Sequence, residues 1–116
     1  MRPEERDAAS LWDMLSSARD ASGIASGITE RQLRRDRVRM LVLERTMGLL
    51  GEAARRVSSN FREKQPQIPW REIIGLRNIL AHEYGGVDHA RLHATAVKDL
   101  PALIARLEEL QSPDDS

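Results

Sequence analysis

The spacing of the apolar residues constrains this chain most strongly, because these residues recur at intervals of three and four and do not alternate. Such intervals place apolar side chains on one face of an α-helix, whereas a half-buried strand needs an interval of two. Clusters of β-branched residues are also lacking. We therefore predict an all-α fold, an up-down bundle of four to five helices. The clearest apolar stripe consists of Met40, Leu43, Met47, Leu50, Ala54 and Val57.

Capping residues set the expected helix boundaries in the first half of the chain. A first helix should begin at about Pro3, with acidic residues in its first turn, and run towards Gly23. A loop rich in glycine and serine follows. Thr29 and Gln32 have the spacing of a capping box, so we predict that one long helix starts there and continues to Val57 as the central core helix.

Proline and glycine residues divide the second half. Residues 66–69 should break the chain, and Pro69 with Trp70 should open a helix that Gly85 and Gly86 close. Asp88 has the position of an N-cap for the next helix. Pro101 predicts a kink or a fresh start within that last helical stretch. Short connections join antiparallel helices, so the long helix and the helix that starts at Trp70 should be neighbours.

The length of 116 residues suits a single domain, to which we assign residues 1–111, with residues 112–116 as a disordered tail. The chain has no cysteine, no apolar run near 18 residues and no charged-then-apolar leader. A disulfide framework, a membrane span and a secretory signal are therefore not expected, and the cytoplasm is the expected location. Aromatic residues are only 3% of the chain, too few for a stacking platform for single-stranded nucleic acid.

The formal net charge is zero, but the charges are unevenly distributed along the chain. Residues 30–82 carry 12 basic and 6 acidic groups, residues 1–29 carry 3 and 5, and residues 83–116 carry 3 and 7. Sixteen of the 18 basic residues are arginine. Arginine suits bidentate contacts with phosphate, although genome base composition is an equally good explanation for this bias.

Residues 77–84 have the sequence RNILAHEY and place an unusual group of polar side chains next to an apolar run. The helical period puts Ile73, Ile74, Leu76, Leu80 and Ala81 on one arc of the helix, and Arg77 projects from the middle of that arc. A charge in such a position needs a partner or a ligand. The pattern therefore indicates a functional site.

Three further side chains accompany Arg77. Asn78 and His82 form an i,i+4 pair on the flank of the same arc. Tyr84 follows Arg77 by seven residues and so returns to its side of the helix. The sequence thus predicts that a guanidinium, an imidazole and a phenol line one neighbourhood.

An arginine followed five positions later by a histidine, with a polar residue directly after the arginine and a tyrosine two after the histidine, resembles the motif of the HEPN superfamily. Within that superfamily the chain is most similar to the HepT-like toxins. The flanking segments LLGEAA at 49–54, IPWR at 68–71 and GVD at 86–88 carry the same resemblance. The similarity covers most of residues 35–103.

This resemblance implies a compact helical domain that forms a homodimer and brings two copies of the Arg77 and His82 pair to a shared cleft. It implies a metal-independent endoribonuclease, acting without a cofactor, that is the toxin of a toxin–antitoxin system. The antitoxin of this group is a minimal nucleotidyltransferase that silences the toxin by transferring AMP to the motif tyrosine, here Tyr84. RNA and the antitoxin are the expected partners.

The residue types fit this chemistry. Cleavage of RNA without a metal requires a base for the 2′-hydroxyl proton, an acid for the leaving 5′-oxygen and positive charge near the phosphorane. His82 can transfer protons near neutral pH, and Arg77 can hold the phosphate. Asn78 would orient the imidazole or a phosphate oxygen, and Tyr84 would hydrogen-bond the phosphate. A phosphodiester on Tyr84 would place negative charge and bulk where the substrate phosphate must lie.

Each of these residues also has a structural interpretation. Arg77 could form a buried ion pair with Glu52 or Glu44 on the long helix. His82 could be an interfacial histidine with satisfied hydrogen bonds, and Tyr84 an anchoring phenol at a helix end. At the level of function, the alternative to the nuclease is a non-catalytic helical partner that docks a nucleotidyltransferase and binds nucleotides.

Two other groups of residues carry side chains that can bind ligands. His89 and His93 have the i,i+4 spacing of metal ligands, but no third ligand is near them in the sequence, so we interpret them as part of an exposed polar face. A cluster of arginines is either an approach surface for RNA or a solvated helix face interleaved with Glu30 and Asp36. The cluster comprises Arg31, Arg34, Arg35, Arg37 and Arg39.

Overall fold

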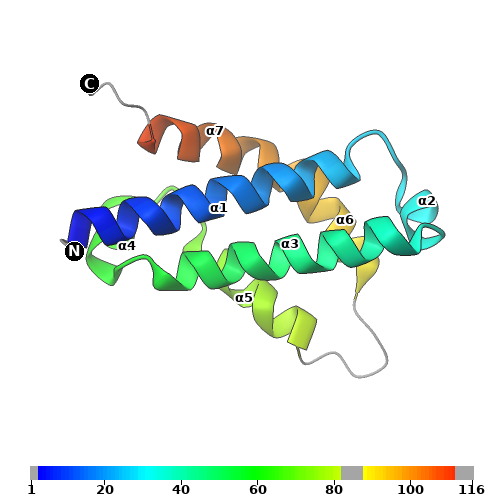
Figure 1. Ribbon diagram of the computed structural model, residues 1–116, viewed down its shortest axis with the longest axis horizontal. Coiled ribbons are helices and arrows are strands. Elements are labelled where there is room, and N and C mark those ends of the chain that lie inside the picture. The colour runs from blue at the N-terminus through cyan, green and yellow to red at the C-terminus, as the bar shows by residue number, and fades with distance from the viewer. Residues whose placement is uncertain (1–2, 82–87, 112–116) are drawn as a thin grey trace.

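The computed structural model describes residues 3–81 and 88–111, and at positions 3, 4, 77–79 and 81 it describes the backbone without the side chain. Within these ranges every regular element is helical (Figure 1), which confirms the all-α class. The four longest helices are α1 (Pro3–Ala25), α3 (Arg37–Arg56), α5 (Trp70–Ala81) and α7 (Leu100–Leu110). The shorter elements are α2 (Glu30–Arg34), α4 (Ser59–Lys64), α6 (His89–Ala94) and the π-helical turn η1 (Thr95–Asp99).

The core lies where α1 packs along both α3 and α7, and α5 packs on another side of α3 (Figure 1). The predicted stripe of α3 is buried along its whole length, with Leu43, Met47 and Leu50 completely inaccessible to solvent. Burial of each such side chain contributes about 1.5–3 kcal/mol relative to exposure. The expected contact between the central helix and the helix that starts at Trp70 is confirmed as the packing of α5 on α3.

The start of the central helix differs from the prediction. The capping box of Thr29 and Gln32 is present, but it opens the five-residue helix α2. The chain then breaks at Asp36, whose side chain accepts a hydrogen bond from the backbone N–H of Arg39 and caps α3. A second N-cap thus interrupts the continuous helical pattern, because Asp is favoured at an N-cap and disfavoured in the interior of a helix.

Helix α4 was not predicted, and it anchors the end of α3 to the start of α1. The carboxylate of Asp7 accepts hydrogen bonds from the backbone N–H of Ser58 at 2.9 Å and from its hydroxyl at 2.7 Å. Ser58 in turn caps α4 by accepting from the N–H of Phe61. The expected break follows, since α4 ends at Lys64 and α5 begins at Trp70.

The predicted interruption near Pro101 is confirmed, since α7 begins at Leu100 and Pro101 lies in its first turn. Helices α6 and α7 are joined by η1, so helical backbone runs from His89 to Leu110. Proline lacks an N–H and its ring clashes with the preceding turn, and the wider π turn just before Pro101 accommodates both defects. Asp88 caps α6 as expected, accepting from the N–H of Arg91. None of the described helices is long and apolar enough to cross a bilayer.

Two predictions concern segments outside the described residues. The closing glycines, Gly85 and Gly86, belong to the first of these segments, 82–87. The proposed tail, residues 112–116, is the second. The assignment of residues 1–111 to one domain stays a prediction.

Candidate functional site around the motif helix

Helix α5 carries the start of the motif, and both of its ends are held in place. At its start, Trp70 is buried and its Nε1 donates to the carbonyl of Gln65 at 2.9 Å. Near its end, Leu80 lies on α3, where a Cβ added to Gly48 would be 3.5 Å from Leu80 Cδ1. The end of α5 therefore lies within ordinary contact distance of a small side chain at position 48 of α3.

The structure places the predicted site residues only in part. Arg77 and Asn78 are in α5, but their side chains, like the whole of His82 and Tyr84, lie outside the described residues. The apolar arc expected around Arg77 is confirmed for the members whose side chains are described, since Ile73 and Leu76 are buried and Ile74 and Leu80 are half-buried. That the four polar side chains converge stays a prediction.

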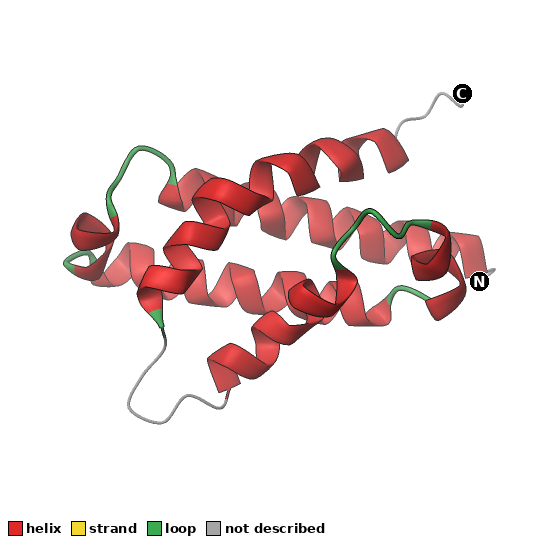
Figure 2. Cartoon of the chain, turned by 180° about the vertical axis from the view of Figure 1, so that it is seen from behind, coloured by secondary structure: helices red, strands yellow, loops and turns green. Residues whose placement is uncertain are grey.

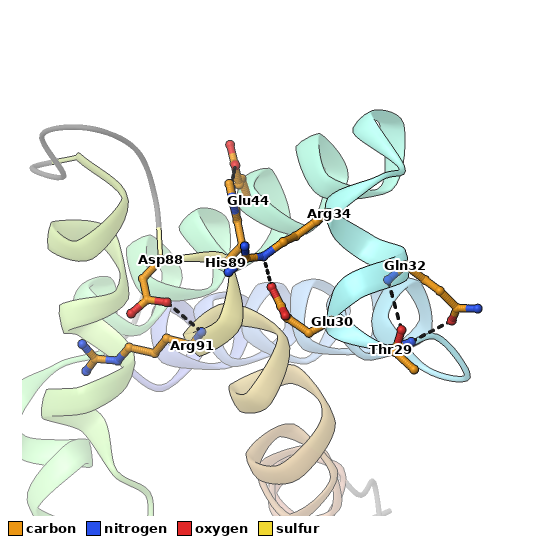
Figure 3. Close-up of polar contacts among 8 residues, drawn as sticks. All are labelled: Thr29, Glu30, Gln32, Arg34, Glu44, Asp88, His89 and Arg91. Atoms are coloured by element: carbon orange, nitrogen blue, oxygen red, sulfur yellow. Dashed lines mark hydrogen bonds and ion pairs between the residues drawn. The ribbon is translucent and has the colours of Figure 1, made fainter.

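Helix α6 contacts α3 one turn before Gly48, at a place that we call the motif corner, defined by Glu44 and Arg45 of α3 and His89 of α6. The Nε2 atom of His89 lies 2.8 Å from Oε2 of Glu44 (Figure 3), and both side chains are about 30% exposed. Arg45 is exposed and has no polar partner within the described ranges. Within the described ranges, the motif corner therefore presents the unpaired guanidinium of Arg45 beside the carboxylate of Glu44, which is already hydrogen-bonded to His89.

The interpretation of His89 and His93 as an exposed polar face is wrong. Both are half-buried and hydrogen-bonded, and Nε2 of His93 donates to the carbonyl of Ile28 at 2.8 Å. Their shared face packs towards α2 and α3, which a lone helical pattern does not reveal. Across the described ranges, no three His, Asp or Glu side chains gather where they could hold a metal ion.

The two carboxylates that are alternative partners for Arg77 in the sequence have other contacts. Glu44 contacts His89, as described, and Oε2 of Glu52 lies 4.0 Å from Nη1 of Arg56. Sequence reasoning did not identify the contact between Glu44 and His89, because the two residues are 45 positions apart and share no local pattern.

The arginine cluster has features both of a solvated helix face and of an approach surface for RNA. Arg34 forms an ion pair with Glu30, and Arg39 forms one with Asp36 at 3.1 Å, as expected for a solvated helix face. The other three arginines are exposed and lack polar partners in the part of the chain that the structure describes, so they are available to an anion. These are Arg31, Arg35 and Arg37.

A groove of about 540 Å³ lies on the other flank of α5, between this helix and the stretch formed by α6, η1 and α7. Figure 2 shows α5 and α7 diverging on this side of the bundle. The floor of the groove consists of buried aliphatic side chains, and charged side chains line its rim. Sequence reasoning missed the groove, because its walls come from three regions of the chain. The floor includes Leu50, Ile73, Leu76, Leu100 and Leu103.

Comparison with known proteins identifies a family and several relatives of this chain. A family model described as "Ribonuclease HepT-like" matches residues 14–110. The chain is 35% identical over 98 residues to "Putative RNase MJ1380" of Methanocaldococcus jannaschii, covering 84% of this chain and 90% of the relative. It is 34% identical over 76 residues to "Probable ribonuclease HepT" of Thermococcus cleftensis, covering 66% and 69%. No solved structure matches the chain significantly.

Proposed function

We propose that this chain, which belongs to the HepT-like ribonuclease family, is a metal-independent endoribonuclease and the toxin of a toxin–antitoxin pair. Family membership makes the chain a ribonuclease and RNA its substrate. The observation that carries the proposal is the family match, which spans α3, α5, α6 and the whole motif. A cytoplasmic location follows from the proposal, since RNA and the antitoxin would meet the enzyme there.

Arg77 and His82 are the proposed catalytic residues. His82 takes the proton of the 2′-hydroxyl, and the 2′-oxygen attacks the adjacent phosphorus. The 5′-oxygen leaves with a proton, and the product carries a 2′,3′-cyclic phosphate. Arg77 stabilises the added negative charge on the phosphorane, and Asn78 orients the imidazole or a phosphate oxygen.

A homodimer is part of the proposal, because a second His82 would supply the acid for the leaving group. Two exposed apolar side chains of α3, near the motif corner, support a dimer contact on this helix. On α3, Val38 is 71% exposed and Leu41 is 47% exposed. Leu41 precedes Arg45 of the motif corner by one helical turn. Large exposed apolar side chains that lie together on one helix are typical of contact surfaces.

The antitoxin would regulate the enzyme through Tyr84. The phenol oxygen of Tyr84 attacks the α-phosphorus of ATP on a nucleotidyltransferase partner, and pyrophosphate leaves. The resulting phosphodiester carries negative charge into the place where the RNA phosphate would bind. Inhibition would then require no change of fold.

Cleavage of total RNA by the purified chain in excess EDTA tests the catalytic proposal. Wild type should cleave and leave 2′,3′-cyclic phosphate ends, and folded Arg77→Ala and His82→Ala variants should lose cleavage. Intact mass must confirm that Tyr84 is unmodified. If folded, unmodified wild type cleaves no RNA, the chain is the non-catalytic partner of a nucleotidyltransferase.

A further inference from the structure

The rim of the groove beside α5 carries a basic stripe. Arg91, Lys98 and Arg106 recur at intervals of seven and eight along the continuous helical stretch from α6 to α7. Such intervals correspond to two helical turns, so the three cations lie along one wall, about 10–12 Å apart. A row of this kind can follow the backbone of a nucleic acid strand.

Two of these three cations are free to bind a ligand. Arg106 contacts Glu109 at 2.7 Å, whereas the guanidinium of Arg91 and the ammonium of Lys98 make no hydrogen bond or ion pair within the described ranges. Figure 3 shows the side chain of Arg91 extending from α6 away from His89. Because neither side chain is paired within the described ranges, Arg91 and Lys98 are available to bind phosphate.

The rim also carries two carboxylates, Glu72 on α5 and Asp99 in η1, both exposed. A carboxylate would repel a simple polyanion, but it accepts hydrogen bonds from the exocyclic amino groups of bases. The aliphatic floor suits the flat face of a base, and the volume of about 540 Å³ is typical of ligand pockets. Cations, carboxylates and an apolar floor together fit a nucleotide better than a purely apolar peptide helix.

We propose that this groove is a nucleotide subsite, in which a base of the RNA strand lies on the aliphatic floor and its flanking phosphates contact Arg91 and Lys98. The inference rests on the proposed ribonuclease function. The groove is next to the start of the motif on α5, since Ile73 lies one turn before Arg77. Because Glu72 and Asp99 can accept from an amino group, cytosine is preferred to uracil.

Binding of a fluorescent 2′-O-methyl tetracytidine to the full chain tests the subsite, because this probe has no 2′-hydroxyl and cannot be cleaved by the proposed route. Arg91→Ala and Lys98→Ala should each weaken binding about tenfold. Each should also reduce the slope of log affinity against log salt concentration by about 0.7. Ala102→Trp, which fills the groove at an exposed position, should weaken binding and leave the slope unchanged.

Arg55→Ala is the matched control. Arg55 is an exposed arginine of α3 that does not line the groove and has no polar partner within the described ranges, so its loss should leave affinity and salt slope unchanged. The base preference is measured with 2′-O-methyl tetrauridine. Wild type should bind tetracytidine about tenfold more tightly than tetrauridine, and Glu72→Gln should narrow this ratio.

Several outcomes would overturn the subsite. If wild type cleaves RNA but does not bind the probe, or if the groove variants bind it like Arg55→Ala, the ribonuclease stands and the subsite is wrong. If light scattering shows that Arg91→Ala or Ala102→Trp changes the oligomeric state, the groove is a protein interface. If wild type neither binds the probe nor cleaves RNA, both the subsite and the proposed function are wrong.

Discussion

The imidazole of His89 and the carboxylate of Glu44 join α6 to α3, with Nε2 and Oε2 2.8 Å apart. His89 is the first residue of α6 and follows segment 82–87, while Leu80, just before that segment, lies on Gly48. Glu44 and Gly48 are one turn apart on α3. The chain on both sides of residues 82–87 is therefore fixed to the same short stretch of α3.

The contact between His89 and Glu44 should be measurable as a coupling energy. Glu44→Ala and His89→Ala should each lower the free energy of unfolding by about 1 kcal/mol, since both side chains are partly buried and hydrogen-bonded. A double-mutant cycle by urea unfolding should give a coupling of about 0.5–1 kcal/mol. The cycle of Glu44→Ala with His93→Ala is the control and should be additive, because His93 contacts Ile28. A coupling of zero in the first cycle would contradict the contact.

Asp7→Ala should destabilise the protein by about 2 kcal/mol. Asp7 is 6% exposed and accepts two hydrogen bonds from Ser58, so its removal leaves the hydroxyl and N–H of Ser58 without their partners. Asp13→Ala, on the same helix, removes an exposed ion pair with Arg56 and should cost less than about 0.5 kcal/mol. Thermal or urea unfolding compares the two, and equal losses would rule out the anchoring role of Asp7.

Gly48 offers a test of how closely α5 must approach α3. An alanine Cβ there would meet Leu80 at an ordinary contact distance of 3.5 Å, so Gly48→Ala should be tolerated and stabilise α3 by up to about 1 kcal/mol. Gly48→Leu should lower the melting temperature, because the larger side chain displaces Leu80 and with it the end of α5. We expect Gly48→Ala to keep RNA cleavage and Gly48→Leu to reduce it. An unaffected Gly48→Leu enzyme would show that the position of α5 is not critical.

The proposed dimer surface can be tested by placing a charge on it. Leu41→Asp should turn the dimer into a monomer and reduce cleavage, since a buried unpaired carboxylate is costly in an interface. Val97→Asp is the matched control, because Val97 is exposed to a similar extent, 44% against 47%, on the distant η1 turn. Analytical ultracentrifugation of both variants beside wild type gives the oligomeric state. A dimer that survives Leu41→Asp must use another surface.

Local sequence rules predicted the helices well where capping and periodicity agree. The cap of Asp88 and the capping box of Thr29 are both present, because such hydrogen bonds involve residues three positions apart. The same rules failed at Asp36, where two neighbouring caps competed, and at Ser58, whose partner Asp7 is 51 positions away. A signal between residues so far apart cannot be read from one window of sequence.

In the candidate site, too, some features follow from local sequence and others only from the tertiary structure. The apolar arc around Arg77 follows from the 3.6-residue period, and the sequence alone determined it, together with the all-α class and the family. Only the tertiary structure decided that His89 contacts Glu44 and that Leu80 meets Gly48. It also decided that α5 and α7 diverge to leave a groove. Helical periodicity specifies which side of a helix is apolar, whereas the partner of that side depends on how whole helices pack.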